Sequence, residues 1–338
     1  MNKKIRVGLI GTGRIGKLHA ENIVGNLYEY AELKSVADVY FEGAKELAKR
    51  LNIKNAYQDY HDILSDREID AVIICSSTNT HCQIIIDSAN NVKEIFCEKP
   101  IDLSVDKIKD ALNVVDKKGV KLQLGFNRRF DHNFKKIYDI VRKGDIGDVH
   151  VIKVTSRDPA PPPIDYIKVS GGIFLDMAIH DFDMLRYISG SEANEVFATG
   201  GVMIDPAIGK IGDIDTAVTI VKMKNNIICL VDNSRKSVYG YDQRLEVFGS
   251  KGCLIADNNT PTNVKHYNDL SVNSDKPYYF FLERYKNAYI NELREFFESI
   301  RIDKKPLVSG IDGLKSTYIA LAAKESLMKG DKIEVKEF

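Results

Sequence analysis

Asp176 and His180 lie four residues apart in a segment of glycine and apolar residues. In a helix, this spacing places a carboxylate and an imidazole on the same face, one turn apart. A neighbouring carboxylate fixes the tautomer of the imidazole and stabilises its protonated form, so that the histidine can accept a proton near neutral pH. Such a pair, taken alone, is more often part of an ordinary surface or core helix, and its interpretation therefore depends on the rest of the chain.

Length, composition and charge set the class of protein. The 338 residues are enough for a large core and predict two domains. Hydrophobic residues make up 44% of the chain and charged residues 28%, as in an ordinary globular protein. Lys and Arg number 48, as do Asp and Glu, so the net charge is zero. This balance argues against a general nucleic-acid or membrane-surface partner.

The cysteines and the apolar runs indicate the cellular setting. The five cysteines are odd in number and form no C-x-x-C pair, which argues against a disulfide framework and a zinc knuckle. The apolar run at residues 5–10 is interrupted by Arg6 and is too short for a signal peptide. We find no apolar stretch long enough to span a bilayer, and we expect a cytoplasmic protein.

Residues 1–125 alternate short apolar runs with helical patterns, which predicts an N-terminal domain with a doubly wound parallel sheet. The predicted strands cover residues 6–10, 33–37, 71–75, 94–97 and 121–125, and the predicted helices include residues 16–24, 41–51 and 105–118.

Residues 126–338 show longer runs in which apolar and polar residues alternate, and these predict an α+β domain with a large, open, mostly antiparallel sheet. The predicted strands cover residues 149–155, 195–201, 216–223, 227–234 and 244–249. Two amphipathic helices, over residues 282–300 and 310–329, follow and can pack back on the first domain. The proline-rich residues 158–163 are interpreted as a stiff extended loop, which can be a simple connector.

A G-x-G-x-x-G motif follows the first predicted strand and precedes a predicted helix. In this context Gly11 permits the tight turn, Gly13 lets the backbone approach a pyrophosphate, and Gly16 allows the helix to pack closely on the strand. Asp38 ends the second strand, where an acidic residue accepts hydrogen bonds from ribose hydroxyls and repels a 2′-phosphate. The motif therefore predicts NAD rather than NADP as the cofactor, and its contact residues include Arg14 and Ile15.

Polar residues follow two further strands of the predicted parallel sheet. Ligands of such sheets bind at the carboxyl ends of the strands, so we expect these residues to border the cofactor. Glu98 and Lys99 end one strand close to the expected nicotinamide position, and Pro100 restricts the backbone of Lys99. A solvated Glu-Lys pair is the alternative interpretation. The residues after the preceding strand are Ser76, Thr78, Asn79 and His81.

Several motifs then coincide in order: Glu-Lys-Pro at 98–100, Gly-Phe-Asn-Arg-Arg-Phe-Asp at 125–131, and Gly-Gly-Ile-Phe-Leu-Asp at 171–176, followed by His180. With the N-terminal glycine motif, the chain resembles the Gfo/Idh/MocA oxidoreductase family over essentially its whole length. Within the family it is most similar to the branch of inositol 2-dehydrogenases. The segments at 155–163, 179–185 and 239–244 support that comparison.

The resemblance implies a Rossmann domain joined to an α/β domain whose sheet often forms an oligomer interface, with a homotetramer favoured and a dimer as the alternative. It also implies reversible hydride transfer between NAD and a cyclic polyol or sugar. We expect oxidation of myo-inositol to scyllo-inosose. The alternatives are another inositol isomer or an aldose as substrate, an NAD-dependent glycosidase, and a non-catalytic NAD-binding sensor.

The resemblance also implies roles for particular residues. Lys99, Asp176 and His180 match the catalytic positions, with His180 as the base, Asp176 polarising it and Lys99 stabilising the developing alkoxide. We expect no metal, because hydride transfer needs none and because Asp181 and Asp183 would point away from His180 on a helix. The expected polyol contacts are Lys99, Asn127, Arg129, Asp158, Asp176, His180 and Tyr239, with Asp158 at a position where some relatives carry Asn.

Overall fold

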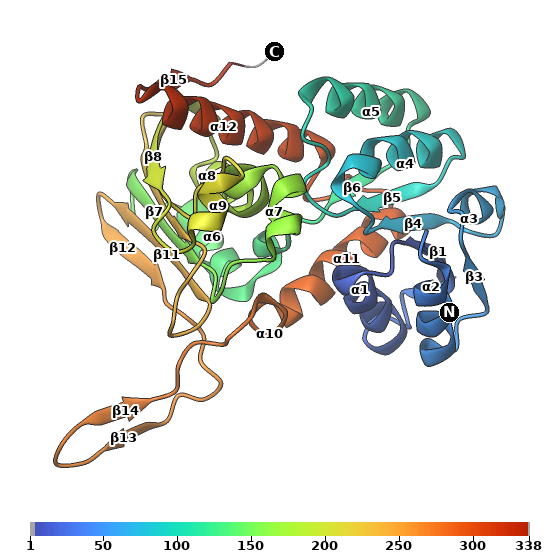
Figure 1. Ribbon diagram of the computed structural model, residues 1–338, viewed down its shortest axis with the longest axis horizontal. Coiled ribbons are helices and arrows are strands. Elements are labelled where there is room, and N and C mark those ends of the chain that lie inside the picture. Colours follow the sequence, from blue (N-terminus) through green and yellow to red (C-terminus); the bar gives the residue numbers. More distant parts are fainter. Residues whose placement is uncertain (1–3, 337–338) are drawn as a thin grey trace. The chain divides into compact units, whose positions relative to one another are not determined.

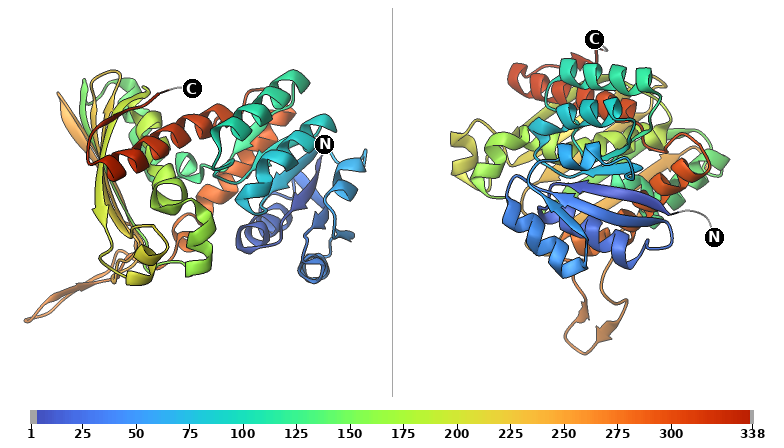
Figure 2. Two further views of the ribbon diagram at one scale, coloured as in Figure 1. Left: turned by 45° about the horizontal axis from the view of Figure 1, so that its top comes forward. Right: turned by 90° about the vertical axis from the view of Figure 1, so that its right-hand side faces the viewer.

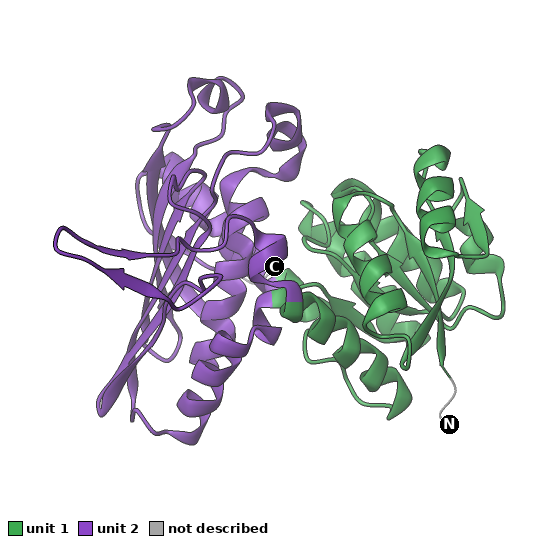
Figure 3. Ribbon diagram, turned by 90° about the horizontal axis from the view of Figure 1, so that it is seen from below, with its two compact units in different colours: residues 1–127, 287–314 green, residues 128–286, 315–338 purple. Residues whose placement is uncertain are grey.

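The computed structural model describes residues 4–336, which fold into two compact units (Figure 3). Unit 1 comprises residues 1–127 and 287–314, and unit 2 comprises residues 128–286 and 315–338. The expected boundary lies between residues 125 and 126. Residues 287–314, which include parts of the two C-terminal helices that could pack back on the first domain, belong to unit 1.

Unit 1 contains a six-stranded sheet in the order β3-β2-β1-β4-β5-β6, in which every pair of neighbours is parallel. All five predicted strands are present. The short strand β3 was missed because its three residues are only half-buried and form no apolar run. The strands are β1 (Ile5–Ile10), β2 (Ala31–Ala37), β3 (Asn55–Tyr57), β4 (Ala71–Ile74), β5 (Glu94–Cys97) and β6 (Leu122–Leu124).

Helices cover both faces of this sheet, with α4 and α5 on one side and α1, α2 and α11 on the other (Figure 1). The second group encloses a core in which Leu9 and Phe96 of the strands meet Leu293 and Phe296 of α11. Each such buried side chain stabilises the unit by about 1.5–3 kcal/mol. The helices are α1 (Arg14–Gly25), α2 (Phe41–Leu51), α3 (His61–Ser65), α4 (Thr78–Asn90), α5 (Val105–Lys118) and α11 (Lys286–Arg301).

Unit 2 contains a seven-stranded sheet in the order β12-β11-β7-β10-β9-β8-β15. Its neighbours are antiparallel except β7 and β10, which are parallel, so the predicted mostly antiparallel sheet is confirmed. A separate hairpin pairs β13 with β14. The strands are β7 (Val149–Arg157), β8 (Ala193–Gly201), β9 (Thr216–Met223), β10 (Ile228–Ser234), β11 (Asp242–Gly249), β12 (Gly252–Ala256), β13 (Lys265–Tyr267), β14 (Val272–Ser274) and β15 (Ile333–Glu334).

Helices cover one face of this sheet, and the other face is open (Figure 2). Helix α8 packs against β7, and α6 packs against β12. On β9 the side chains alternate as expected for one covered face: Val221 is fully buried, whereas Val218 and Ile220 are 38% and 43% exposed.

The helical elements of unit 2 include a short π-helix directly before α8. The predicted helix over residues 282–300 is interrupted at Tyr285 and forms two helices, α10 and α11. Among residues 4–336, no helix has the length and apolar character needed to cross a membrane. The remaining elements are η1 (Asn127–Phe130), α6 (His132–Lys143), α7 (Ile164–Ser170), η2 (Phe174–Ala178), α8 (Ile179–Ser189), α9 (Pro206–Lys210), α10 (Phe281–Arg284) and α12 (Gly310–Lys329).

Candidate active site

The glycine-rich loop between β1 and α1 has the shape of a phosphate cradle. Gly11 has a φ of +96°, and a Cβ there would lie 2.6 Å from the Cys75 carbonyl carbon. A Cβ at Gly16 would lie 1.9 Å from the Gly11 oxygen, so both positions require glycine for the fold itself. A Cβ at Gly13 would meet no atom within 4 Å. Gly13 therefore leaves room for a ligand at the N-terminus of α1, where a pyrophosphate fits.

Asp38 is fixed beside this loop at the end of β2. Its Oδ2 accepts hydrogen bonds from the Thr12 backbone nitrogen at 2.6 Å and from the Thr12 hydroxyl at 2.9 Å. Its Oδ1 accepts a hydrogen bond from the Tyr40 nitrogen at 2.8 Å. Each carboxylate oxygen can accept more than one hydrogen bond, so the oriented carboxylate suits a pair of ribose hydroxyls.

Replacing Asp38 with alanine tests this assignment. We expect the Kd for NAD to rise about 10–100-fold, because a hydrogen bond to a charged group contributes about 1.5–3 kcal/mol. The preference for NAD over NADP should narrow, because the charge that repels a 2′-phosphate is lost. Calorimetric titration with both nucleotides measures the two constants. Asp110→Ala, at an exposed position on α5, is the matched control. An unchanged ratio of the two constants would remove Asp38 from the cofactor site.

His81 and its neighbours occupy the turn from β4 into α4. Thr78 and Asn79 begin the helix, and the Ser76 and Thr80 hydroxyls lie 2.8 Å apart. The His81 ring, which we expected to border the cofactor, is buried: Nδ1 lies 2.9 Å from the Pro100 carbonyl oxygen and Nε2 lies 3.0 Å from that of Ser76. Burial lowers the pKa of this imidazole. His81 therefore supports the turn that follows Lys99, and its contacts argue against a direct role in cofactor binding.

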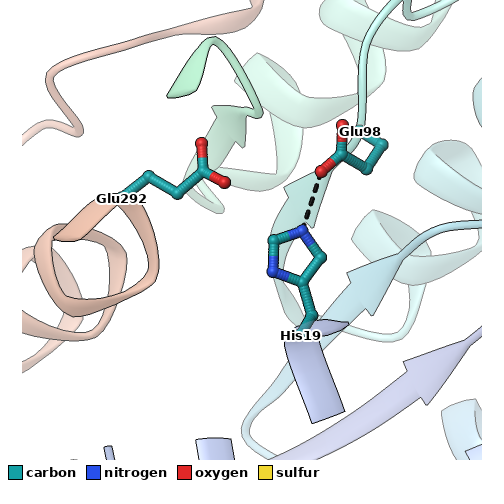
Figure 4. Close-up of side chains that lie close together, drawn as sticks. All are labelled: His19, Glu98 and Glu292. Atoms are coloured by element: carbon teal, nitrogen blue, oxygen red, sulfur yellow. Dashed lines mark hydrogen bonds and ion pairs between the residues drawn. The ribbon is translucent and has the colours of Figure 1, made fainter. Parts of the chain in front are cut away.

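Glu98 and Lys99 follow β5, and the peptide bond between Lys99 and Pro100 is cis. The Glu98 carboxylate accepts a hydrogen bond from His19 on α1, with Nε2 and Oε1 2.7 Å apart. Its side chain is 13% exposed, which argues against the solvated Glu-Lys pair. The carboxyl group of Glu292 on α11 lies beside His19 and Glu98 (Figure 4).

Asp176 and His180 lie in consecutive but different helical elements of unit 2. Asp176 is in the π-helix η2, and His180 is the second residue of α8. One unbroken helical run over residues 172–189 therefore carries both side chains, and a π-helical turn lies within it. A π-helical turn is wider than an α-helical turn and occurs frequently at functional sites. The four-residue spacing thus spans a change of helix type.

Two residues that the sequence analysis missed hold the Asp176 carboxylate, and a third holds one of these two. Tyr166 donates a hydrogen bond to Oδ1 at 2.8 Å, and Arg235 lies 3.3 Å from Oδ2 through Nη1. The Arg235 side chain is fully buried, and its Nη2 lies 3.5 Å from Oδ2 of Asp213. Asp213 in turn accepts a hydrogen bond from the Ile173 nitrogen just before η2, at 3.2 Å. Arg235 and Asp213 therefore connect the Asp176 carboxylate to the backbone of the segment that carries Asp176.

The expected polyol contacts differ in what their side chains do. Asn127 is 2% exposed, and its Nδ2 has no hydrogen-bond partner among the described residues, which suits a ligand-binding role. Tyr239 is 39% exposed and donates to Asp242 at 2.6 Å. Asp158 uses its backbone oxygen to accept a 2.6 Å hydrogen bond from Ser237, which holds the proline-rich loop.

Arg129, also expected in the polyol pocket, is buried in an internal ion pair. Its Nε lies 2.8 Å from Oδ2 of Asp183, and its guanidinium stacks over the Tyr187 ring at 4.9 Å. These contacts argue against a substrate role for Arg129. Asp181 pairs in the same way with Arg128, so both acidic residues that follow His180 are engaged in ion pairs.

Comparison with known proteins agrees with this geometry. Residues 5–126 match the model of the oxidoreductase family with an NAD-binding Rossmann fold, and residues 134–255 match that of the GFO/IDH/MocA C-terminal domain. A myo-inositol 2-dehydrogenase of Thermotoga maritima is 47% identical, covering 98% of this chain and 99% of the relative. An inositol 2-dehydrogenase of Rhizobium meliloti is 42% identical, with the same two coverages.

A solved structure extends the comparison to the fold. The scyllo-inositol dehydrogenase of Lactobacillus casei, with bound NAD(H) and scyllo-inositol, has a TM-score of 0.92 and 32% identity, covering 98% of this chain and 99% of that chain. The glycine loop and the oriented Asp38 described above fit the NAD that the family binds. This chain belongs to the Gfo/Idh/MocA family of NAD-binding oxidoreductases.

Proposed function

We propose that the protein oxidises myo-inositol to scyllo-inosose, with NAD as the acceptor. The observation that carries the proposal is the fixed carboxylate of Asp176, held by Arg235 and Tyr166, four residues before His180. Relatives named as inositol 2-dehydrogenases, matching over nearly the whole chain, support the substrate class.

The reaction requires removal of a hydroxyl proton while a hydride leaves the carbon that bears this hydroxyl. Bound NAD supplies the nicotinamide carbon that accepts the hydride. In our proposal His180 takes the proton, and Asp176 orients the imidazole and stabilises its charged form. Lys99 stabilises the oxygen as negative charge develops on it. Because Arg235 and Tyr166 fix Asp176 before substrate binds, little reorganisation is needed during the reaction.

Recognition of a cyclic polyol requires several hydrogen-bonding groups that leave no hydroxyl unpaired. The buried amide of Asn127 can donate to a substrate oxygen, and Asp158 and Tyr239 add polar groups of their own. An epimer with one misplaced hydroxyl leaves a buried polar group unsatisfied and is rejected. We therefore expect the rates with different inositol isomers to differ.

A spectrophotometric assay of NADH formation tests the proposal. We expect the highest kcat/KM with myo-inositol in a panel that also contains scyllo-inositol, chiro-inositol and common aldoses. A higher value for scyllo-inositol, the ligand named for the Lactobacillus casei structure, would assign the enzyme to that isomer instead. NADH formation with none of these compounds would overturn the proposed function.

We further propose that the enzyme is a homotetramer that uses the open face of the seven-stranded sheet. Phe197, Ile220 and Ile228 on that face are 39%, 43% and 52% exposed, although they belong to neighbouring central strands. Apolar side chains that lie side by side on a sheet are typical of a contact surface. Sedimentation velocity of the wild type and of Ile220→Lys measures the state, and an unchanged tetramer in the variant would exclude this face.

A further inference from the structure

His19, Glu98 and Glu292 form a buried cluster within unit 1 (Figure 4). They come from three elements: α1, the segment after β5, and α11. One potential ligand atom from each lies within 4.8 Å of the others. His19 and Glu292 have no exposed surface, and both carboxylate oxygens of Glu292 lack a hydrogen-bond partner among the described residues. Figure 4 shows the Glu292 carboxyl group directed toward the other two residues.

The spacing in this cluster favours a hydrogen-bonded pair of His19 and Glu98 beside a protonated Glu292 over a metal ion. The 2.7 Å between His19 Nε2 and Glu98 Oε1 is the length of a hydrogen bond. Two ligands about 2.0–2.2 Å from a tetrahedral zinc ion would be separated by roughly 3.4 Å. A metal would therefore have to break the contact between His19 and Glu98, whereas a proton on Glu292 leaves that contact intact.

The surroundings of Glu292 favour its neutral form. Burial raises its pKa well above the usual range, and the nearby Glu98 carboxylate raises it further. The half-buried Cys75 thiol and the buried Cys97 thiol both have raised pKa values, and the rings of Phe96 and Tyr289 pack edge-on against His19. An ionised Glu292 would be a buried charge close to a second carboxylate, which is costly.

The cluster also connects two segments that the proposed chemistry needs. His19 lies on α1, one turn after Gly16 of the phosphate cradle. Glu98 immediately precedes Lys99, and its backbone nitrogen donates to the Ile74 oxygen at 2.9 Å. A Cβ at Gly125 would lie 3.0 Å from Oε2 of Glu98, so the carboxylate is closely confined. A change in the position of Glu98 would therefore move Lys99.

We propose that Glu292 is a neutral carboxylic acid that packs beside the hydrogen-bonded pair of His19 and Glu98, and that this network of three residues positions Lys99. Glu292 and His19 are positioning residues, since they act through Glu98. The effect of Glu292 and His19 on turnover rests on the proposed function, in which Lys99 takes part in catalysis. The protonation state of Glu292 does not depend on that function.

Infrared spectroscopy of the full chain tests the protonation directly. At pH 8, in the wild-type protein, we expect the carbonyl stretching band of a protonated carboxylic acid. This band should be lost in Glu292→Gln and retained in Glu298→Gln, a half-buried position on the same helix. Absence of the band from the wild type would overturn the proposal. So would a stoichiometric metal ion, measured by elemental analysis, that Glu292→Gln fails to bind.

Kinetics test the positioning role. Glu292→Gln, an isosteric mimic of the neutral acid, should keep kcat within about twofold of the wild type. Glu292→Ala should lower kcat roughly 10–100-fold, because a small misplacement of a catalytic group has effects of this size. The KM and the Kd for NAD should change little. An equal kcat for the wild type and Glu292→Ala would overturn the positioning role. If the protein oxidises no polyol, the proposed function fails, while the infrared band still decides the state of Glu292.

Discussion

Replacing His180 with alanine should lower kcat for polyol oxidation about 10²–10⁴-fold, the usual contribution of a positioned general base. The variant retains Asp38 and the glycine loop, which lie in unit 1, so the Kd for NAD should stay close to that of the wild type. Stopped-flow measurement of NADH formation, combined with calorimetric titration of NAD, separates the two quantities. His266→Ala, at an exposed position in the β13 strand, is the matched control.

The pH profile of the same variant gives a second readout. A base that must be neutral to accept a proton makes kcat/KM fall on the acidic side of its pKa. This acidic limb should be lost or displaced in His180→Ala, and the control should retain it. Equal losses of kcat and of NAD affinity would indicate a general structural defect and argue against the base role. An unchanged acidic limb would assign the titration to another group.

The helices, strands and loops that position the site could be predicted because the sequence pattern that indicates each one lies within a single short segment. The glycine motif lies within six consecutive residues, and Gly16 packs against the Gly11 oxygen only five positions away. The spacing of apolar residues that indicates a strand or a helix is likewise set within one short segment. The helices over residues 41–51, 105–118 and 310–329 begin and end where the sequence indicates. Strand β3 was missed because three half-buried residues carry too little pattern.

Side-chain partners distant in the sequence could not be predicted in the same way. Arg235 contacts Asp176 across 59 positions of the chain, and Arg129 contacts Asp183 across 54. A sequence shows that these residues are charged but not which opposite charge each one meets after folding. The resemblance placed Arg129 with the substrate, whereas its contacts place it in the interior of unit 2. His19 offered a weak signal, since it follows Gly16 by three residues on the buried side of α1.

Arg128 and Asp181 form the second feature for which we expect a large effect, in this case on stability. Both side chains are buried, with 5% and no exposure, and they are joined by a hydrogen-bonded ion pair. Arg128 also contacts the Ser156 hydroxyl at 3.1 Å, and Asp181 accepts from Asn233 at 2.8 Å. Removing one partner of such a pair leaves a buried charge without compensation.

Arg128→Met should therefore lower the free energy of unfolding of unit 2 by about 3–5 kcal/mol. Urea titration followed by circular dichroism measures the loss. The double variant Arg128→Met with Asp181→Asn should recover most of it, because the amide keeps the shape of the side chain but carries no charge. If the double variant is as unstable as Arg128→Met, the loss arises from packing, and the account based on an unpaired charge is wrong.

The pH dependence of Arg128→Met provides an independent check on the same account. Burial already raises the pKa of Asp181, and Arg128 opposes that shift, so removing Arg128 should raise the pKa further. The folded variant then binds a proton at Asp181 at pH values where the unfolded chain does not. Its stability deficit is full above the folded-state pKa and shrinks as the pH falls through it toward the range of an ordinary carboxyl group. The double variant lacks this carboxyl group, so its stability relative to the wild type should not show the same gain on acidification.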